Sequence, residues 1–302
     1  MTGVFDIQGF GFKSDWNGEF RTSAAHSAME EIAATNANAI SIAPRYFTSN
    51  RTASSVIADP GKTESDSNIA ATIADAHDLG LSVLLKPMLT GLDGTNQGQI
   101  SPGDVNAFFA SYKAELLDLA QIAERTGVET LSVGNELSKL SGEQYRDYWV
   151  DLIDSIRTVY HGDITYSAAT DEAIHVSFWD KVDDIGVNAY PPLTTKTDPT
   201  VQEMVAAWNS VSANDYWAAA MDHKSPVDFM HSLALDYGKP VLFTEAGYRS
   251  VDGTNIAPGG WTGSSTQDVQ EQHDAFDAFF QVWGSQGGSW FKGAHIWDWD
   301  PD

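Results

Sequence analysis

The sequence has no cysteine among its 302 residues. This absence excludes disulfide bonds, thiolate metal sites and cysteine nucleophiles, so any chemistry must come from other side chains. Long apolar runs are missing too: no window of 18 apolar residues is present, and the first residues lack the basic and apolar segments of a signal peptide. We therefore expect no membrane-spanning segment.

Basic residues are scarce as well. The chain has 17 Lys and Arg against 42 Asp and Glu, which gives a formal net charge of −25. Nucleic acids and anionic membrane surfaces are bound mainly through Lys and Arg, and a surface this negative repels them. We predict neither as a partner. The hydrophobic fraction of 42% is typical of a globular protein with a sizeable core.

Short apolar runs alternate along the chain with segments of helical periodicity. The expected strands are residues 4–10, 38–43, 82–86, 130–133, 164–168, 184–188, 240–243 and 294–297. The expected helices are 23–35, 67–79, 104–125, 142–159, 226–237 and 267–283, with a short turn near 178–181. This alternation predicts a parallel sheet. Because no Gly-rich phosphate-binding loop follows any strand, we favour a single-domain (β/α)8 TIM barrel over residues 1–302 rather than an open nucleotide-binding sheet.

No segment of helical periodicity follows the eighth expected strand before the sequence stops at Asp302. The eighth helix of the barrel is therefore expected to be missing from this chain. The groove outside the eighth and first strands would then lack its usual cover. We expect further domains C-terminal to this chain, or another element that packs there.

Two glutamates stand at the ends of apolar strands, Glu136 after 130–133 and Glu245 after 240–243. A carboxylate at the edge of an apolar core is costly to desolvate unless it has partners, so two such placements are unusual. In a closed barrel the fourth and seventh strands lie nearly opposite each other, and their C-terminal ends face one cavity. Paired carboxylates in one cavity suit glycoside hydrolysis, which needs one protonated and one ionised carboxyl group.

The neighbours of these glutamates fit a sugar-binding pocket. Asn135 precedes Glu136 and can bond a sugar hydroxyl, most usefully the 2-hydroxyl. Tyr190 follows the sixth expected strand, where its hydroxyl can orient Glu245 and hold it ionised. Trp297 ends the eighth strand and offers a flat apolar face to a sugar ring. Each residue alone is compatible with plain packing, and together they predict a pocket.

Several stretches in a fixed order also carry a family resemblance. They are Gln8-Gly9-Phe10 with Trp16, the segment 76–87, Val133-Gly134-Asn135-Glu136-Leu137, Phe178-Trp179-Asp180 with Ile185-Gly186-Val187, the segment 243–250, and Trp297-Asp298-Trp299-Asp300-Pro301. With them the sequence resembles the clan A glycoside hydrolases, and more narrowly it is similar to family 113, known for endo-β-1,4-mannanases. The resemblance covers nearly the whole chain.

The resemblance implies the roles of the two carboxyl groups. Glu136 would be the acid/base and Glu245 the nucleophile of a retaining, double-displacement hydrolase that needs no cofactor and acts on a polysaccharide or oligosaccharide. Trp16 lies in a matching stretch and would contact substrate. An enzyme of this class is expected to be extracellular or secreted, with an export signal that is not present in this chain.

No motif in the sequence indicates which glycosidic bond would be cleaved. Clan A shares its catalytic machinery among mannan, glucan, xylan and galactan enzymes, and specificity resides in loops such as 48–62, 90–103 and 191–226. The last of these carries Trp208, Tyr216 and Trp217, which suit either glycan subsites or a packed loop core. Arg45 and Lys86, at the ends of the second and third strands, are candidates to bond hydroxyls or the catalytic carboxylates, or to form structural ion pairs.

Other readings stay open at this point. A glucanase, xylanase or galactanase is compatible with the same motifs, and so is a non-catalytic glycan-binding barrel in a larger assembly. Lys86 at a strand end also allows a Schiff-base aldolase. The eight histidines show no zinc-binding spacing, so we expect no metal site.

Overall fold

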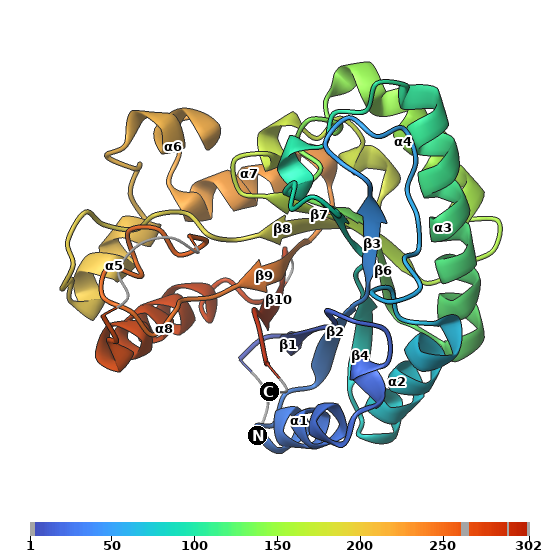
Figure 1. The fold of residues 1–302 in the computed structure, drawn as a ribbon. Coiled ribbons are helices and arrows are strands. Elements are labelled where there is room, and N and C mark those ends of the chain that lie inside the picture. The colour runs from blue at the N-terminus through green and yellow to red at the C-terminus, as the bar shows by residue number, and fades with distance from the viewer. Residues whose placement is uncertain (1–3, 261–265, 289, 301–302) are drawn as a thin grey trace.

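Eight parallel strands close into a barrel in the part of the chain that the computed structural model describes, residues 4–260, 266–288 and 290–300 (Figure 1). They are β1 (Ile7–Lys13), β2 (Ala39–Ala43), β4 (Ser82–Leu85), β6 (Thr130–Asn135), β7 (Asp163–Ala169), β8 (Asp184–Asn188), β9 (Val241–Ala246) and β10 (Phe291–Ile296). Their order around the barrel is β1-β10-β9-β8-β7-β6-β4-β2, so neighbours in space follow each other along the chain. The predicted (β/α)8 barrel is confirmed.

Helices surround the barrel. They are α1 (Ser23–Ala34), α2 (Asp66–Asp78), α3 (Val105–Thr126), α4 (Arg146–Ile156), α5 (Val201–Trp208), α6 (Asp215–Ala220), α7 (Pro226–Tyr237) and α8 (Val269–Trp283). Side chains cap the starts of α1, α2, α3, α7 and α8: Thr22, Ser65, Asp104, Ser225 and Asp268 each accept a bond from a first-turn amide. Short 3₁₀ turns lie at Glu19–Arg21, Gln97–Gln99, Glu143–Tyr145, Ala173–His175 and Trp179–Lys181. The last is the turn expected near 178–181.

Four elements lie where the sequence shows no pattern. β3 (Arg45–Thr48) and β5 (Met88–Gly91) pair in parallel beyond the ends of β2 and β4. Helices α5 and α6 occupy the expected loop 191–226. The strands are four residues long, too short to show periodicity, and they pair because β2 and β4 bring their starting points together. Helix α5 is fixed by Trp208, which packs against Phe279 and Trp283 of α8.

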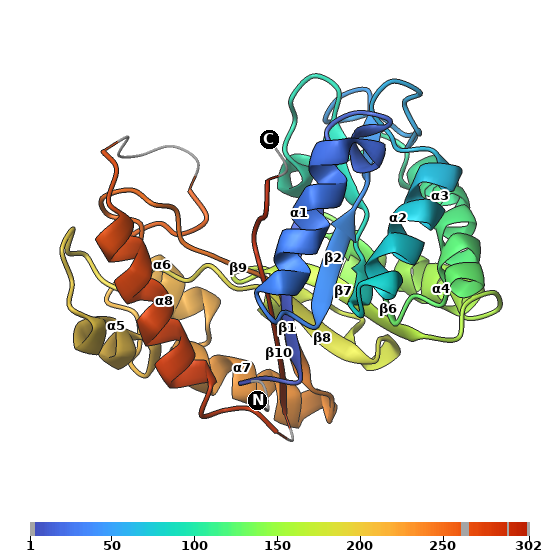
Figure 2. The same cartoon turned by 90° about the horizontal axis from the view of Figure 1, so that it is seen from below.

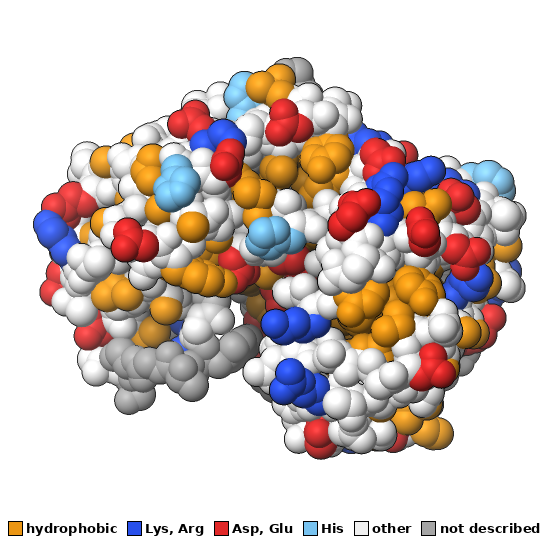
Figure 3. All heavy atoms as spheres, turned by 90° about the horizontal axis from the view of Figure 1, so that it is seen from above, with side chains coloured by type: hydrophobic (Ala, Val, Ile, Leu, Met, Phe, Trp, Pro, Cys, Tyr) orange, Lys and Arg blue, Asp and Glu red, His pale blue; other side chains and the backbone are white. Residues whose placement is uncertain are grey.

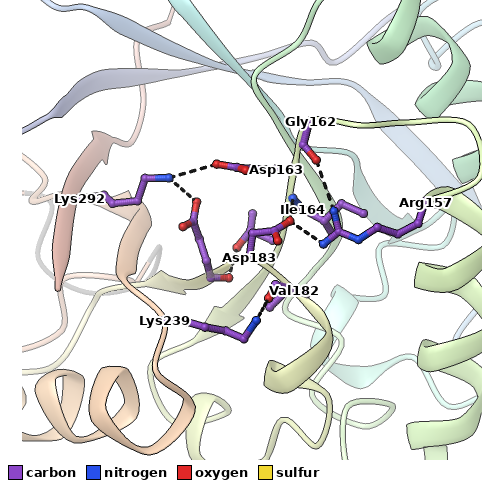
Figure 4. Close-up of polar contacts among 10 residues, drawn as sticks. Arg157, Gly162, Asp163, Ile164, Val182, Asp183, Lys239 and Lys292 are labelled. Atoms are coloured by element: carbon purple, nitrogen blue, oxygen red, sulfur yellow. Dashed lines mark hydrogen bonds and ion pairs between the residues drawn. The ribbon is translucent and has the colours of Figure 1, made fainter. Parts of the chain in front are cut away.

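The N-terminal ends of the strands are tied by polar contacts (Figure 4). Lys292 on β10 contacts Asp184 at 2.7 Å and Asp163 at 3.4 Å, which joins three strands. Arg157 contacts Asp183 at 2.5 Å, and Lys239 donates to the carbonyl of Val182. These contacts lie where two short 3₁₀ turns, rather than a full helix, connect β7 to β8.

In the described part of the chain no helix follows β10. Figure 2 shows β1 and β10 between α8 and α1, with no helix across them. A groove of about 190 Å³ lies there, lined by apolar side chains that include Phe10, Phe280 and Ile296. Pro301 and Asp302 lie outside the described residues. None of the described helices is long and apolar enough to span a membrane.

Candidate active site

A cavity of about 1010 Å³ opens at the C-terminal ends of the strands. Both Glu136 and Glu245 line it, together with Tyr190 and Trp297. Residues 247–251 and 256–260, after β9, form one wall, and β3 and β5 contribute to the other. The face in Figure 3 is hollowed near its centre, with acidic side chains inside the hollow.

Glu136 directly follows β6 and is held by neutral donors. Its Oε1 accepts a bond from Asn188 Nδ2 and its Oε2 accepts one from Gln97 Nε2, each at 2.8 Å. Burial, aided by the negative charge of Glu245, raises the pKa of Glu136, although the two amide bonds and Lys86 partly oppose this. A carboxyl group in this environment keeps its proton to higher pH than a free glutamate, as a general acid must.

The backbone of Glu136 adopts an unusual conformation. Its φ is 49°, in the left-handed region that costs a residue with a side chain on the order of 1–3 kcal/mol. The Glu136 amide donates to the carbonyl of Ser167 at 2.8 Å, which helps to hold this turn. Such strain is typical of functional positions, and here it turns the side chain at the end of the strand.

Glu245 lies within β9 and has different partners. Lys86 Nζ contacts Oε1 and the hydroxyl of Tyr190 donates to Oε2 at 3.0 Å. Lys86 is fully buried and also lies 4.1 Å from the centroid of the Trp297 ring. Burial, with the charge of Glu245, raises the pKa of Tyr190 well above its usual value, so this hydroxyl stays a donor. Both donors stabilise negative charge on Glu245.

The two glutamates therefore differ in their electrostatic environment. One faces two neutral amides and a like charge, while the other contacts a buried cation and a phenol. Environments that differ in this way allow one carboxyl group to act as an acid while the other stays an anion. The cavity can therefore support acid-assisted nucleophilic displacement.

The remaining predicted residues lie at different depths. Asn135 is buried and is not one of the residues that line the cavity: its Oδ1 accepts from Asn188 at 3.0 Å, and its Nδ2 has no partner among the described residues. Arg45 lines the cavity and forms an ion pair with Asp15 at 2.6 Å. Trp16 lies outside the residues that line the cavity and is 47% exposed.

The three loop aromatics have separate environments. Trp217 lines the cavity. Tyr216 is 61% exposed and donates to Asp171. Trp208 is buried against α8 and is a packing residue.

Sequence reasoning missed the two residues that bond Glu136. Asn188 ends β8, so the search of strand ends that found Asn135 could also have found it. The hydroxyl of Thr244 donates to Asn188 Oδ1 at 2.8 Å, which points the amide group of Asn188 toward Glu136. Gln97 comes from the segment 90–103 and has no signal in the sequence.

Among the described residues no group of three or more His, Asp or Glu side chains is arranged to hold a metal ion.

Comparisons with known proteins identify the family and match the fold. The family model for Glycoside Hydrolase Family 113 matches residues 8–302. A β-1,4-mannanase of that family, solved as a complex, is 25% identical, with a TM-score of 0.82 over 98% of this chain and 89% of that one. A second β-1,4-mannanase structure of the family is 27% identical, with a TM-score of 0.82 and the same coverage of both chains.

The β-mannanase AaManA from Alicyclobacillus acidocaldarius, solved in complex with ManMIm, is 27% identical, with a TM-score of 0.81 over 99% of this chain and 88% of that one. No curated protein sequence matches at a significant level. The family match spans nearly the whole chain, and the barrel carries its two glutamates at the strand ends. The chain belongs to glycoside hydrolase family 113 and is a glycoside hydrolase.

Proposed function

We propose that the chain is a retaining endo-β-1,4-mannanase that works by double displacement, with Glu136 as acid/base and Glu245 as nucleophile. The observation that carries the mechanism is the contrast between the neutral donors on Glu136 and the Lys86 and Tyr190 donors on Glu245. The substrate is proposed because structures similar over 98–99% of this chain are named β-mannanases.

In the first step the Glu245 carboxylate attacks C1 of the sugar on the non-reducing side of the scissile bond. The bond between C1 and the glycosidic oxygen breaks, and its electron pair moves to that oxygen. Glu136 transfers its proton to the same oxygen, so the leaving sugar departs as a neutral alcohol. Glu245 is now esterified and Glu136 is ionised.

In the second step water attacks C1 and displaces the Glu245 carboxylate. Glu136 accepts the proton of that water, which restores both groups. The change of role follows from charge: once Glu245 is esterified it no longer repels a negative charge on Glu136, so Glu136 is a weaker acid before the first step than after it. Both half-reactions balance without a cofactor.

The cavity supplies contacts for a chain of sugars. Trp297 and Trp217 line it and offer aromatic faces. The proposal adds a bond to the 2-hydroxyl from Asn135 Nδ2, which is buried without a partner among the described residues. The volume of about 1010 Å³ is at the upper end of the roughly 300–1,000 Å³ of small-molecule sites. A site this large fits several sugar rings, which supports internal cleavage of a polymer.

Two measurements test the proposal. Reducing-sugar release is compared on β-mannan, glucomannan, xylan, β-glucan and galactan for the wild type and Glu136→Gln, and NMR records the anomeric configuration of the first product from mannotetraose. We expect release from mannan that Glu136→Gln abolishes, and a β-product. A first-formed α-product contradicts retention, and stronger release from another glycan on the panel contradicts the substrate.

Mass spectrometry identifies the nucleophile. A 2-deoxy-2-fluoro mannosyl fluoride slows the second step, so the proposal expects a stable adduct on the peptide that contains Glu245. An adduct on another residue contradicts the assignment. The aldolase alternative needs a Lys86 amine that is free to attack a carbonyl, whereas Lys86 Nζ is buried in contact with Glu245.

The proposal also extends to the cellular location. A polymeric glycan does not cross a membrane, so we propose that the enzyme acts outside the cell. Fractionation of the source organism tests this, and enzyme confined to the cell interior contradicts it.

A further inference from the structure

The segment that follows Glu136 is anchored outside the barrel. The left-handed turn at Glu136 is followed by Leu137, whose backbone amide donates to the hydroxyl oxygen of Tyr166 at 2.7 Å. Leu137 is fully buried, so this amide has no access to water. A bond one residue beyond Glu136 restrains the direction in which the Glu136 side chain leaves the backbone.

Tyr166 also forms a hydrogen bond with a second carboxyl group, that of Glu172. Because its oxygen accepts the Leu137 amide, its one hydroxyl proton is free to bond elsewhere, and it donates to Glu172 Oε1 at 2.6 Å. The ring itself is fixed by packing: it lies edge-on to Trp149 and Phe178, with centroids 5.3 and 5.2 Å away. A bulky, buried ring leaves the hydroxyl little freedom to choose another partner.

Glu172 has no part in the mechanism described above. It is 3% exposed, and its Oε2 accepts from the Ala169 amide at 3.0 Å. Burial raises its pKa to about 7 against the lowering effect of the bonds from Tyr166 and Ala169, and the charge of Glu136 adds to the rise. The titratable groups that face it are Tyr166 on β7 and Glu136 after β6. Among the described residues no Lys or Arg side chain forms an ion pair with it.

We propose that Glu172 is a positioning residue for the reaction: through the hydroxyl of Tyr166 it holds the Leu137 amide, and thereby keeps Glu136 in the conformation that protonates the leaving oxygen. This inference rests on the proposed role of Glu136 as the acid. The carboxyl group of Glu172 orients the Tyr166 proton away from Leu137, so the phenol oxygen presents its lone pair to the amide. Glu172 itself touches no substrate.

The test uses two substrates that differ in their need for an acid. Mannotetraose has a poor leaving group that must be protonated, whereas 2,4-dinitrophenyl β-mannobioside releases a phenolate that leaves without a proton. For Tyr166→Phe and Glu172→Gln we expect kcat/KM to fall about tenfold or more on mannotetraose and less than about threefold on the aryl substrate. Equal losses on both substrates, or no loss, overturn the proposal.

Tyr160→Phe is the matched control. Tyr160 is also buried, and its hydroxyl donates to a backbone carbonyl, that of Val128, at 2.9 Å, before the start of β6. The same atom is removed, so this variant reports the general effect of losing a buried phenol bond, and we expect less than about a threefold change on either substrate. Thermal unfolding and near-UV circular dichroism establish that each variant is folded. If Tyr166→Phe does not fold, Glu172→Gln carries the comparison.

A pH profile adds a readout that packing alone does not change. Glu172→Gln removes a negative charge near Glu136, so the alkaline limb of kcat/KM on mannotetraose moves to lower pH. An alkaline limb that does not move contradicts the coupling between Glu172 and Glu136.

Glu136→Gln distinguishes the acid role of Glu136 from the positioning role of Glu172. If Glu136→Gln lowers kcat/KM equally on mannotetraose and on the aryl substrate, both roles are contradicted. If Glu136→Gln loses more kcat/KM on mannotetraose than on the aryl substrate, but Tyr166→Phe and Glu172→Gln do not, only the positioning role is contradicted.

Discussion

The buried ion pair between Lys86 and Glu245 makes a strong prediction for Lys86→Met. The Lys86 side chain is 0% exposed and that of Glu245 is 7% exposed, so the variant leaves a carboxylate with the Tyr190 hydroxyl and no cation beside it. Removing one partner of a buried pair costs about 3–5 kcal/mol. We expect the free energy of unfolding in urea to fall by that amount, and turnover to be lost.

A surface pair gives the matched control. Lys113 lies 2.7 Å from Asp151, with side chains 30% and 68% exposed, and pairs of this kind contribute about 0–1 kcal/mol. Lys113→Met should therefore change stability by no more than that. The double variant Lys86→Met/Glu245→Gln should recover much of the loss, because the uncompensated charge is gone. The cost assigned to the buried pair is refuted if Lys86→Met lowers the free energy of unfolding as little as Lys113→Met does. It is also refuted if the double variant is no more stable than Lys86→Met.

Three further predictions concern turnover. Glu245→Gln should remove nearly all activity on mannotetraose from protein that circular dichroism shows to be folded, although the loss of one partner of the buried pair also lowers its stability; a variant that keeps more than about a tenth of the rate contradicts its role as nucleophile. The raised pKa of Glu136 means that its acid form persists above the usual range and is lost as pH rises, so kcat/KM should have an alkaline limb that Glu136→Gln lacks. Asn135→Ala should lower kcat/KM on mannotetraose by about tenfold or more, and much less on a 2-deoxy substrate; equal losses contradict the 2-hydroxyl contact.

The parts of the fold that follow from local patterns were predictable. Each of the eight barrel strands overlaps a short apolar run, and α7 spans Pro226–Tyr237, the range predicted from its helical periodicity. The first strand was predicted three residues too early, at 4–10 rather than Ile7–Lys13. Glycines at positions 9 and 11 hide its apolar character, because His295 and Trp297 occupy the space that their side chains would take.

The candidate site was predictable where a strand carries the residue. Glu136 and Glu245 end apolar runs, so their position in the barrel follows from the fold alone. Gln97 and Glu172 lie in turns after β5 and β7, and their contacts depend on how distant segments meet. No local sequence pattern encodes such a contact, which is why the sequence indicated the two carboxyl groups but not Gln97 or Glu172.

The different environments of the two glutamates arise from the strands beside them. Lys86 follows β4, on the far side of the barrel from β9, and crosses its interior to reach Glu245, leaving Glu136 to the amide of Asn188 from β8. The contrast therefore depends on the closed barrel rather than on the residues next to either glutamate. His295 on β10 fits this arrangement: burial and the charge of Lys86 lower its pKa to about 3, so it stays neutral and does not compete with Lys86 for Glu245. Lys86 therefore contacts Glu245 rather than Glu136, as the proposed role of Glu245 as the anion requires.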